Sequence, residues 1–256
     1  MSERIFIGVA WPYANGPLHL GHIAGCYLAA DIFARYHRMR GDDVLMVSGS
    51  DAHGTPITVR AEQEGITPED VLGRFHPLFK DAWERLGITF DLFTTTNTEN
   101  HRKVAQELFL DLLAKGYIYP AQMLLAYCPG CNRFLPDRYV EGICPHCRHD
   151  RARGDQCDNC GRTLDPQDLV EPHCILSNET PEFRESEHFF LKLSAFQEPL
   201  LEWVRRQDHW RPNVLNFTRS FLEGGLKDRA ITRDLTWGVP VPVAGYDDKR
   251  IYVWFE

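Results

Sequence analysis

Apolar runs and amphipathic stretches alternate along the first part of the chain, up to about residue 116. Three of the apolar runs have the length of buried strands: Arg4–Ala10, Asp43–Gly49 and Phe90–Thr95. Two longer stretches have helical spacing and each stops at a glycine: Gly21–Arg40 and Glu99–Lys115. Another helix is predicted to begin with Thr67 as its cap and Pro68 in its first turn. Because strands alternate with helices, this part of the chain predicts a parallel sheet with right-handed crossovers.

From about residue 117 to residue 226 the pattern changes to cysteines, turns and short segments. Within it, Phe189–Leu193 is typical of a strand and Pro199–Arg206 of a short helix. Strand character returns at Ile251–Phe255. The predicted fold class is α/β, a Rossmann-like nucleotide-binding domain whose parallel sheet is split by an insertion. Its predicted parts are residues 1–116 as the first half, 117–226 as the inserted lobe and 227–256 as the start of the second half.

Composition and charge narrow the class of protein. The 256 residues are 43% hydrophobic and 25% charged, which is ordinary for a globular protein. No apolar run approaches the ~20 residues that span a bilayer, and the first residues do not form a secretion signal, so no membrane contact and a cytoplasmic location are expected. A net charge of −8 argues against nonspecific coating of nucleic acid. The segments Arg148–Arg153 and Arg205–Arg206 are candidate basic patches, with a solvated face as the alternative for each.

Eight cysteines in a chain of this type point to metal binding rather than to disulfides. Two C-x-x-C turns, Cys144 with Cys147 and Cys157 with Cys160, have the spacing of a four-thiolate zinc site. All four ligands come from the protein, so this zinc would be structural. Another pair, Cys128 and Cys131, comes before these turns, and Cys174 follows them.

The segment Ala10–His22 lies between a predicted strand and a predicted helix. After Ala10, its sequence is W-P-Y-A-N-G-P-L-H-L-G-H. Strand, tight turn and helix form a nucleotide-binding crossover, in which backbone N–H groups at the helix start face an anion. His19 and His22 are three residues apart, so they share one face and can reach one phosphate chain together. Gly21 has no side chain, so it leaves room for a flat nucleotide base to approach the backbone. The alternative is a loop whose histidines cap the helix.

This segment resembles the first signature of class I aminoacyl-tRNA synthetases, and Trp11-Pro12-Tyr13 resembles the methionyl branch of that family. Further blocks follow in the family's order: Ser50–Ile57, the cysteine turns after Cys128, Ser186–Phe190, Arg233–Pro240 and Tyr252–Glu256. The family's two-zinc members close a second site with a final C-x-x-C. Here that turn runs from Cys174 to Ser177, so a thiolate is missing and the second zinc is doubtful. Three thiolates with His173 or water, or a metal-free turn, are the alternatives.

The resemblance implies ATP-dependent activation of methionine to methionyl-adenylate and its transfer to the acceptor end of tRNA(Met). Mg²⁺ would accompany ATP. The family pattern assigns ATP binding to Asn15, His19, Gly21 and His22. It assigns methionine binding to Trp11, Tyr13, Asp51 and Trp254. Arg233 would join His19 and His22 in catalysis.

Four of these assignments have a structural alternative. Tyr13 and Trp254 could be core aromatics, Asp51 could cap the next helix, and Arg233 could be a surface cation. For His53 and His188, which lie in family blocks, a structural hydrogen-bonding role is expected.

Family members continue after Glu256 with A-P-I-G-Y, a second lysine-bearing signature and an anticodon-binding domain. We therefore expect a fragment with reduced activity alone, completed by a missing C-terminal half. The alternatives are a stand-alone truncated paralogue, a zinc-knuckle nucleic-acid-binding module, and an H-x-G-H nucleotidylyltransferase acting on another substrate. The nucleotide-type turn argues against the binding module, and the cysteine insertion with Tyr13 and Trp254 argues against the nucleotidylyltransferase.

Overall fold

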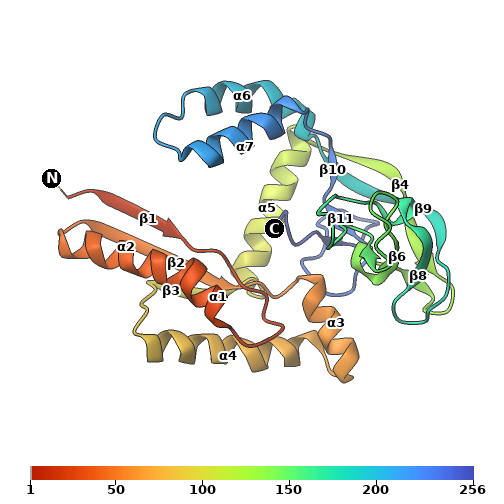
Figure 1. The fold of residues 1–256 in the computed structure, drawn as a ribbon, viewed down its shortest axis with the longest axis horizontal. Coiled ribbons are helices and arrows are strands. Elements are labelled where there is room, and N and C mark those ends of the chain that lie inside the picture. The colour runs from red at the N-terminus through yellow and green to blue at the C-terminus, as the bar shows by residue number, and fades with distance from the viewer. Residues whose placement is uncertain (1) are drawn as a thin grey trace. The chain divides into compact units, whose positions relative to one another are not determined.

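The computed structural model describes residues 2–256 (Figure 1). Contacts between residues divide the chain into two compact units. The first comprises the chain up to Val104 together with Trp237–Val239, and the second comprises Ala105–Thr236 and Pro240–Glu256. The predicted division at residues 116 and 226 stays a prediction.

The first unit contains the predicted parallel sheet. Its strands are β1 (Arg4–Gly8), β2 (Asp43–Ser50) and β3 (Leu92–Thr95), in the order β1-β2-β3. Arg4 pairs with Asp43 and Val47 with Leu92, both in parallel register. The α/β fold class is therefore confirmed, although β1 ends two residues before the predicted limit and β3 begins two residues after it.

Helices of this unit follow the strands in the crossover pattern (Figure 1). They are α1 (Leu20–His22), the π-turn η1 (Ile23–Tyr27), α2 (Leu28–Met39), α3 (Thr55–Glu64) and α4 (Pro68–Leu86), and α5 (Glu99–Ala114) begins here. Thr67 caps α4 as predicted, in a reciprocal capping box with Asp70. The predicted helix over Gly21–Arg40 forms with one π-turn inside it. The sequence pattern gave no bounds for the helix after Asp51, which is α3.

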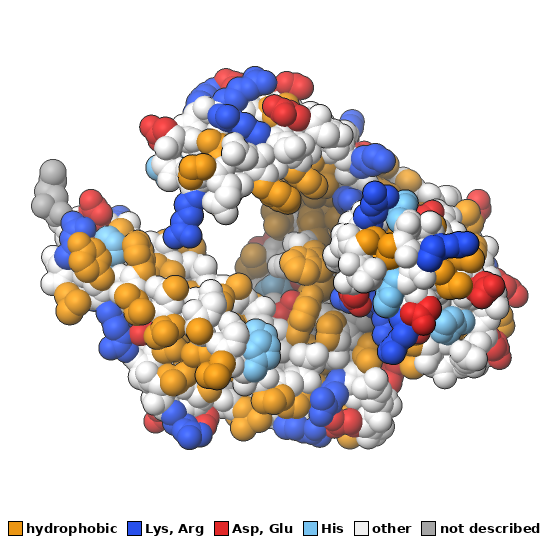
Figure 2. Space-filling model, viewed as in Figure 1, with side chains coloured by type: hydrophobic (Ala, Val, Ile, Leu, Met, Phe, Trp, Pro, Cys, Tyr) orange, Lys and Arg blue, Asp and Glu red, His pale blue; other side chains and the backbone are white. Residues whose placement is uncertain are grey.

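Side chains point alternately to opposite sides along the strands, so one face of the sheet is buried and the other is exposed. Met46 is fully buried in a core with Ile57 and Phe79, and α2 and α4 contribute to that core. The neighbouring positions on the strands, Phe6 and Leu45, point to the other face and are 70% and 50% exposed. Apolar side chains are also visible on the surface of α2 in Figure 2.

The second unit is built mainly from antiparallel strands. One sheet has the order β10-β9-β4-β5, formed by β4 (Ile118–Cys128), β5 (Arg133–Phe134), β9 (Glu182–Leu191) and β10 (Arg229–Ala230). A smaller sheet, β7-β6-β8, consists of β6 (Val140–Ile143), β7 (Ala152–Arg153) and β8 (Val170–Cys174). Short 3₁₀ turns lie at η2 (Asp137–Tyr139), η3 (Pro166–Asp168) and η4 (Leu193–Phe196).

Two helices, α6 (Gln197–Arg205) and α7 (Pro212–Glu223), pack together around Leu201, Val204 and Leu222. The predicted helix at Pro199–Arg206 is confirmed as α6. The predicted strand at Phe189–Leu193 is the end of the much longer β9. The pattern predicted neither β4 nor α7.

The predicted strand at Ile251–Phe255 is wrong. Strand β12 covers only Arg250–Ile251 and pairs with β11 (Thr232–Arg233). After Ile251 the chain turns, because the N–H groups of Phe255 and Glu256 both donate to the Tyr252 carbonyl, at 2.8 and 3.2 Å. The short partner strand ends the ladder, and this tertiary context overrides the β propensity of Val253 and Trp254.

Within residues 2–256, none of the helices has both the length and the apolar character that crossing a bilayer requires.

Candidate functional site

The predicted nucleotide turn joins β1 to α1, and its two histidines cap the helix. The His19 Nδ1 atom accepts hydrogen bonds from the N–H groups of Gly21 and His22, at 3.1 and 3.4 Å. The His22 Nδ1 atom accepts from the His19 N–H at 3.3 Å, which completes a reciprocal capping box. The rings stack with centroids 3.7 Å apart, and both side chains are exposed. Histidine surface is visible over α1 in Figure 2.

Capping assigns a tautomer to each ring. An Nδ1 atom that accepts an N–H bond carries no proton, so the neutral ring holds its proton on Nε2. Partial desolvation lowers the pKa of His22, and a positive charge on His19 would lower it further, so the neutral form of His22 is favoured. Both imidazoles therefore present an Nε2–H donor beside the helix N-terminus, where an anion is favoured. The capping alternative and the phosphate-binding hypothesis are compatible.

Gly21 makes the capping geometry possible. A Cβ atom at this position would lie 2.9 Å from the His19 ring, closer than real contacts allow. Its predicted role beside the adenine of ATP stays a prediction.

Tyr13 and Asp51 lie side by side at the carboxyl ends of β1 and β2. They form a parallel bridge, in which the Asp51 N–H donates to the Pro12 carbonyl and the Ala14 N–H donates to the Asp51 carbonyl, at 2.9 and 3.1 Å. The structure therefore brings together two of the residues assigned to methionine. Gly54, and not Asp51, is the N-cap of α3. The Asp51 carboxylate instead accepts the His53 N–H at 3.2 Å.

Two glycines accommodate the aromatic rings of this segment. A Cβ atom at Gly49 would lie 2.5 Å from the Trp11 ring, and one at Gly54 would lie 2.1 Å from the Tyr13 ring. Both glycines lie in or next to the family blocks, but the sequence pattern alone did not assign them this role. Asn15 is half-buried in the same turn.

Arg233 and Trp254 belong to the second unit. The Arg233 guanidinium donates to the carbonyls of Ala230 and Thr232, at 3.0 and 2.8 Å, and lies 4.2 Å from the centre of the Tyr252 ring. Its side chain is 18% exposed, so it is not a plain surface cation. Trp254 is 79% exposed, so it is not a core aromatic.

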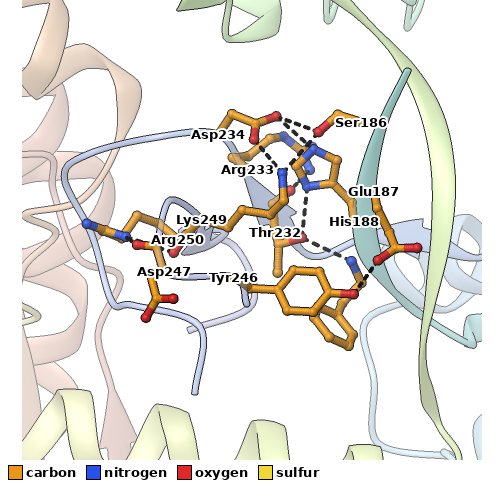
Figure 3. Close-up of polar contacts among 11 residues, drawn as sticks. Ser186, Glu187, His188, Thr232, Arg233, Asp234, Tyr246, Asp247, Lys249 and Arg250 are labelled. Carbon is orange, nitrogen blue, oxygen red and sulfur yellow. Dashed lines mark hydrogen bonds and ion pairs between the residues drawn. The ribbon is translucent and has the colours of Figure 1, made fainter. Parts of the chain in front are cut away.

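A buried polar network fixes the backbone on both sides of Arg233 (Figure 3). Asp234 accepts from His188 Nε2 at 2.9 Å and from the Ser186 hydroxyl at 3.1 Å, and it pairs with Lys249. The other His188 nitrogen lies 2.9 Å from the Thr232 hydroxyl. Burial raises the pKa of Asp234, but hydrogen bonds from His188 and Lys249 outweigh it and lower that pKa to about 2. The expected structural role of His188 is confirmed.

The cysteine turns form two clusters. In the first, the sulfur atoms of Cys144, Cys147, Cys157 and Cys160 all lie within 4.8 Å of one another. The Cys144–Cys160 and Cys147–Cys157 sulfur pairs are 3.9 and 3.6 Å apart. A tetrahedron with Zn–S bonds of about 2.3 Å has edges of about 3.8 Å, so the donor set fits zinc.

The second cluster contains Cys128, Cys131 and Cys174. The sulfur atoms of Cys131 and Cys174 are 3.7 Å apart, and the Ser177 hydroxyl lies 3.1 Å from the Cys128 sulfur. His173 Nε2 instead lies 3.7 Å from the Glu141 carboxylate. A hydroxyl, and not the His173 imidazole, therefore lies beside the three thiols.

The backbone of the Cys174–Ser177 turn matches that of the two C-x-x-C turns in the first cluster. The fifth residue of each turn donates its N–H to the first cysteine's carbonyl: Arg148 to Cys144 at 3.0 Å, Gly161 to Cys157 at 2.8 Å, and Asn178 to Cys174 at 2.8 Å. These three donors have left-handed φ angles of 63°, 71° and 61°. Ser177 thus occupies the position of a second knuckle cysteine.

A family model described as tRNA synthetases class I (M) matches residues 5–256. The chain belongs to this family. The fold with its capped nucleotide turn and the cysteine insertion are consistent with that membership.

Relatives of this chain include proteins named methionine–tRNA ligase. The chain is 65% identical over 256 residues to that of Dehalococcoides mccartyi, covering 100% of the chain and 46% of the relative. It is 60% identical to that of Thermomicrobium roseum, covering 44% of it. A structure of Mycobacterium tuberculosis methionyl-tRNA synthetase in complex with methionyl-adenylate superposes with a TM-score of 0.74 at 26% identity. It is matched over 99% of this chain and 45% of its own, so the chain spans less than half the length of these proteins.

Proposed function

We propose that this chain forms the methionine- and ATP-binding part of a methionine–tRNA ligase. One observation carries the proposal: in one unit, a turn with two imidazole Nε2–H donors follows β1, and the Tyr13–Asp51 bridge joins that same turn to the end of β2. The first feature suits a polyphosphate, and the second provides a carboxylate and an aromatic ring for an amino acid.

The reaction needs charge stabilisation more than proton transfer. The methionine carboxylate attacks the α-phosphate of ATP, a new C–O–P linkage forms, and the bond to pyrophosphate breaks. Since the nucleophile is already ionised, no general base is required. His19 and His22 would donate to the triphosphate, with Asn15 and Gly21 completing the ATP site. Mg²⁺ would bind with ATP and offset its charge.

Methionine recognition would depend on Asp51 and on aromatic surface. A carboxylate pairs with the methionine ammonium, and aromatic rings suit a thioether. Tyr13 and Asp51 would supply these groups, and Trp11 would contribute through its backbone carbonyl. From the family resemblance, Trp254 is also assigned to methionine and Arg233 to activation.

Zinc would stabilise the second unit without taking part in the chemistry. Cys144, Cys147, Cys157 and Cys160 would hold it with no open position. The second cluster would hold zinc more weakly, because Ser177 offers a neutral hydroxyl where a knuckle normally has a thiolate. The product of activation would go to the acceptor end of tRNA(Met) in the cytoplasm.

The proposal is tested by methionine binding and by methionine-dependent pyrophosphate–ATP exchange on the 256-residue chain. We expect methionine to bind, and Asp51→Asn to weaken binding by about 10- to 100-fold, because a charge-assisted hydrogen bond is lost. Asp81→Asn, on the exposed face of α4, is the matched control and should leave binding unchanged. Exchange stimulated by another acid or an alcohol, but not by methionine, would favour a nucleotidylyltransferase instead.

A further inference from the structure

Trp237 contacts the turn that carries Asp51, although it lies far along the chain. Its indole N–H donates to the Ala52 carbonyl at 2.6 Å, across a separation of 185 residues. Its ring meets the His53 ring edge-on, with centroids 5.4 Å apart and planes at 77°. Trp237–Val239 belongs to the first unit, while its flanking residues belong to the second.

The Ala52 carbonyl needs a donor where it lies. Ala52 is fully buried, and a buried carbonyl without a hydrogen bond is unfavourable because it loses its bonds to water without replacement. The N–H of Ala52 is already satisfied by the Thr96 hydroxyl at 2.9 Å. Trp237 supplies the corresponding bond on the carbonyl side.

The peptide unit between Ala52 and His53 connects Trp237 to the Asp51 carboxylate. Its carbonyl accepts from Trp237, and its N–H, which belongs to His53, donates to the Asp51 Oδ1 atom at 3.2 Å. Because a peptide unit is planar, a bond that fixes the carbonyl also fixes the direction of the N–H. The two bonds also polarise one another.

We propose that Trp237 is a positioning residue that orients the Asp51 carboxylate toward the ammonium group of the amino-acid substrate. This inference rests on the proposed function, because it takes Asp51 as the partner of that ammonium. The residue that orients the carboxylate therefore comes from the chain segment after the cysteine insertion.

The test is a double-mutant cycle on methionine binding, measured by calorimetry on the 256-residue chain. Trp237→Phe removes the donor and keeps an aromatic ring. We expect it to weaken methionine binding about 10-fold in the native background and less than about 2-fold when Asp51 is already Asn. ATP affinity should stay within about 2-fold. Trp203→Phe, on the exposed side of α6, is the matched control.

Each outcome decides the proposal. If Trp237→Phe lowers methionine affinity equally in both backgrounds, Trp237 supports packing only. If it leaves methionine affinity unchanged, Trp237 has no role in methionine binding. Either result overturns the inference. If Trp237→Phe does not fold, 3-benzothienylalanine at position 237 keeps the indole shape without its N–H, and the same cycle applies. Failure of the native chain to bind methionine would overturn the proposed function itself, which separates the two hypotheses.

Discussion

His19 and His22 each use one ring nitrogen on the backbone and keep the other for a ligand. Each Nδ1 atom accepts an N–H of the same turn, and this leaves the proton on Nε2. Gly21 permits the arrangement because it has no Cβ atom to meet the His19 ring. At the scale of single residues, the capping and the phosphate-binding roles are therefore separable by substitution.

His19→Asn should separate them. Asparagine is a good N-cap, so the free energy of unfolding should change by less than about 0.5 kcal/mol. It has no donor at the distance of the imidazole Nε2, so ATP affinity should fall about 10-fold or more. Thermal unfolding and ATP titration measure the two effects. His19→Ala should lose both the N-cap and the ATP donor, and the free energy of unfolding should fall by about 1 kcal/mol. An Asn variant with native ATP affinity would contradict the assignment of His19 to ATP binding.

At the scale of elements, the network around Asp234 joins β9 to β11 and to the residue before β12. Ser186 and His188 belong to β9, Thr232 belongs to β11, and Lys249 immediately precedes β12 (Figure 3). Lys249 and Asp234 have side chains only 9% and 14% exposed, so neither charge can be removed without leaving the other buried. These polar contacts supplement the ladder between β11 and β12, which is only two residues long.

Asp234→Asn should therefore destabilise the chain by about 3 kcal/mol at pH 7. The folded-state pKa of about 2 lies below the ordinary value of 3.8. Ionised Asp234 thus contributes stability above pH about 4, and this contribution is lost as the pH falls toward 2. Denaturant unfolding at several pH values measures the free energy of unfolding of the native and variant chains, and the difference between them should shrink over that range. If this difference does not depend on pH there, ionised Asp234 is not the stabilising form.

At the scale of the whole molecule, the chain forms two units that differ in architecture. The first has a parallel sheet with crossover helices, and the second has antiparallel sheets and both cysteine clusters. Trp237–Val239 is the one later segment assigned to the first unit among the residues that the structure describes. The total metal content of the molecule depends on whether one or both clusters hold zinc.

We expect the purified chain to contain about one zinc, held by the four-cysteine cluster. Ser177→Cys should raise this to about two, because it restores a thiolate at the knuckle position. Mass spectrometry of the metal content gives the count, and Ser220→Cys on α7 controls for an added thiol. About two zinc ions in the native chain would contradict the expectation and make Ser177, or a water, an adequate fourth ligand.

Local patterns were readable from the sequence because neighbouring residues produce them. The Thr67 cap, the spacing of the cysteine turns, the nucleotide turn with His19 and His22, and the alternation behind the parallel sheet all depend on short stretches of chain. Their physical basis is the periodicity and the terminal hydrogen bonds of single elements.

Only the tertiary structure decided which distant residues meet. An isolated parallel bridge beyond the ends of β1 and β2 put Tyr13 beside Asp51, and the return of the chain at Trp237 gave the Ala52 carbonyl its donor. The short pairing of β12 ended a strand that its own residues favour. These outcomes depend on contacts between segments far apart in the sequence, whose geometry no local propensity contains.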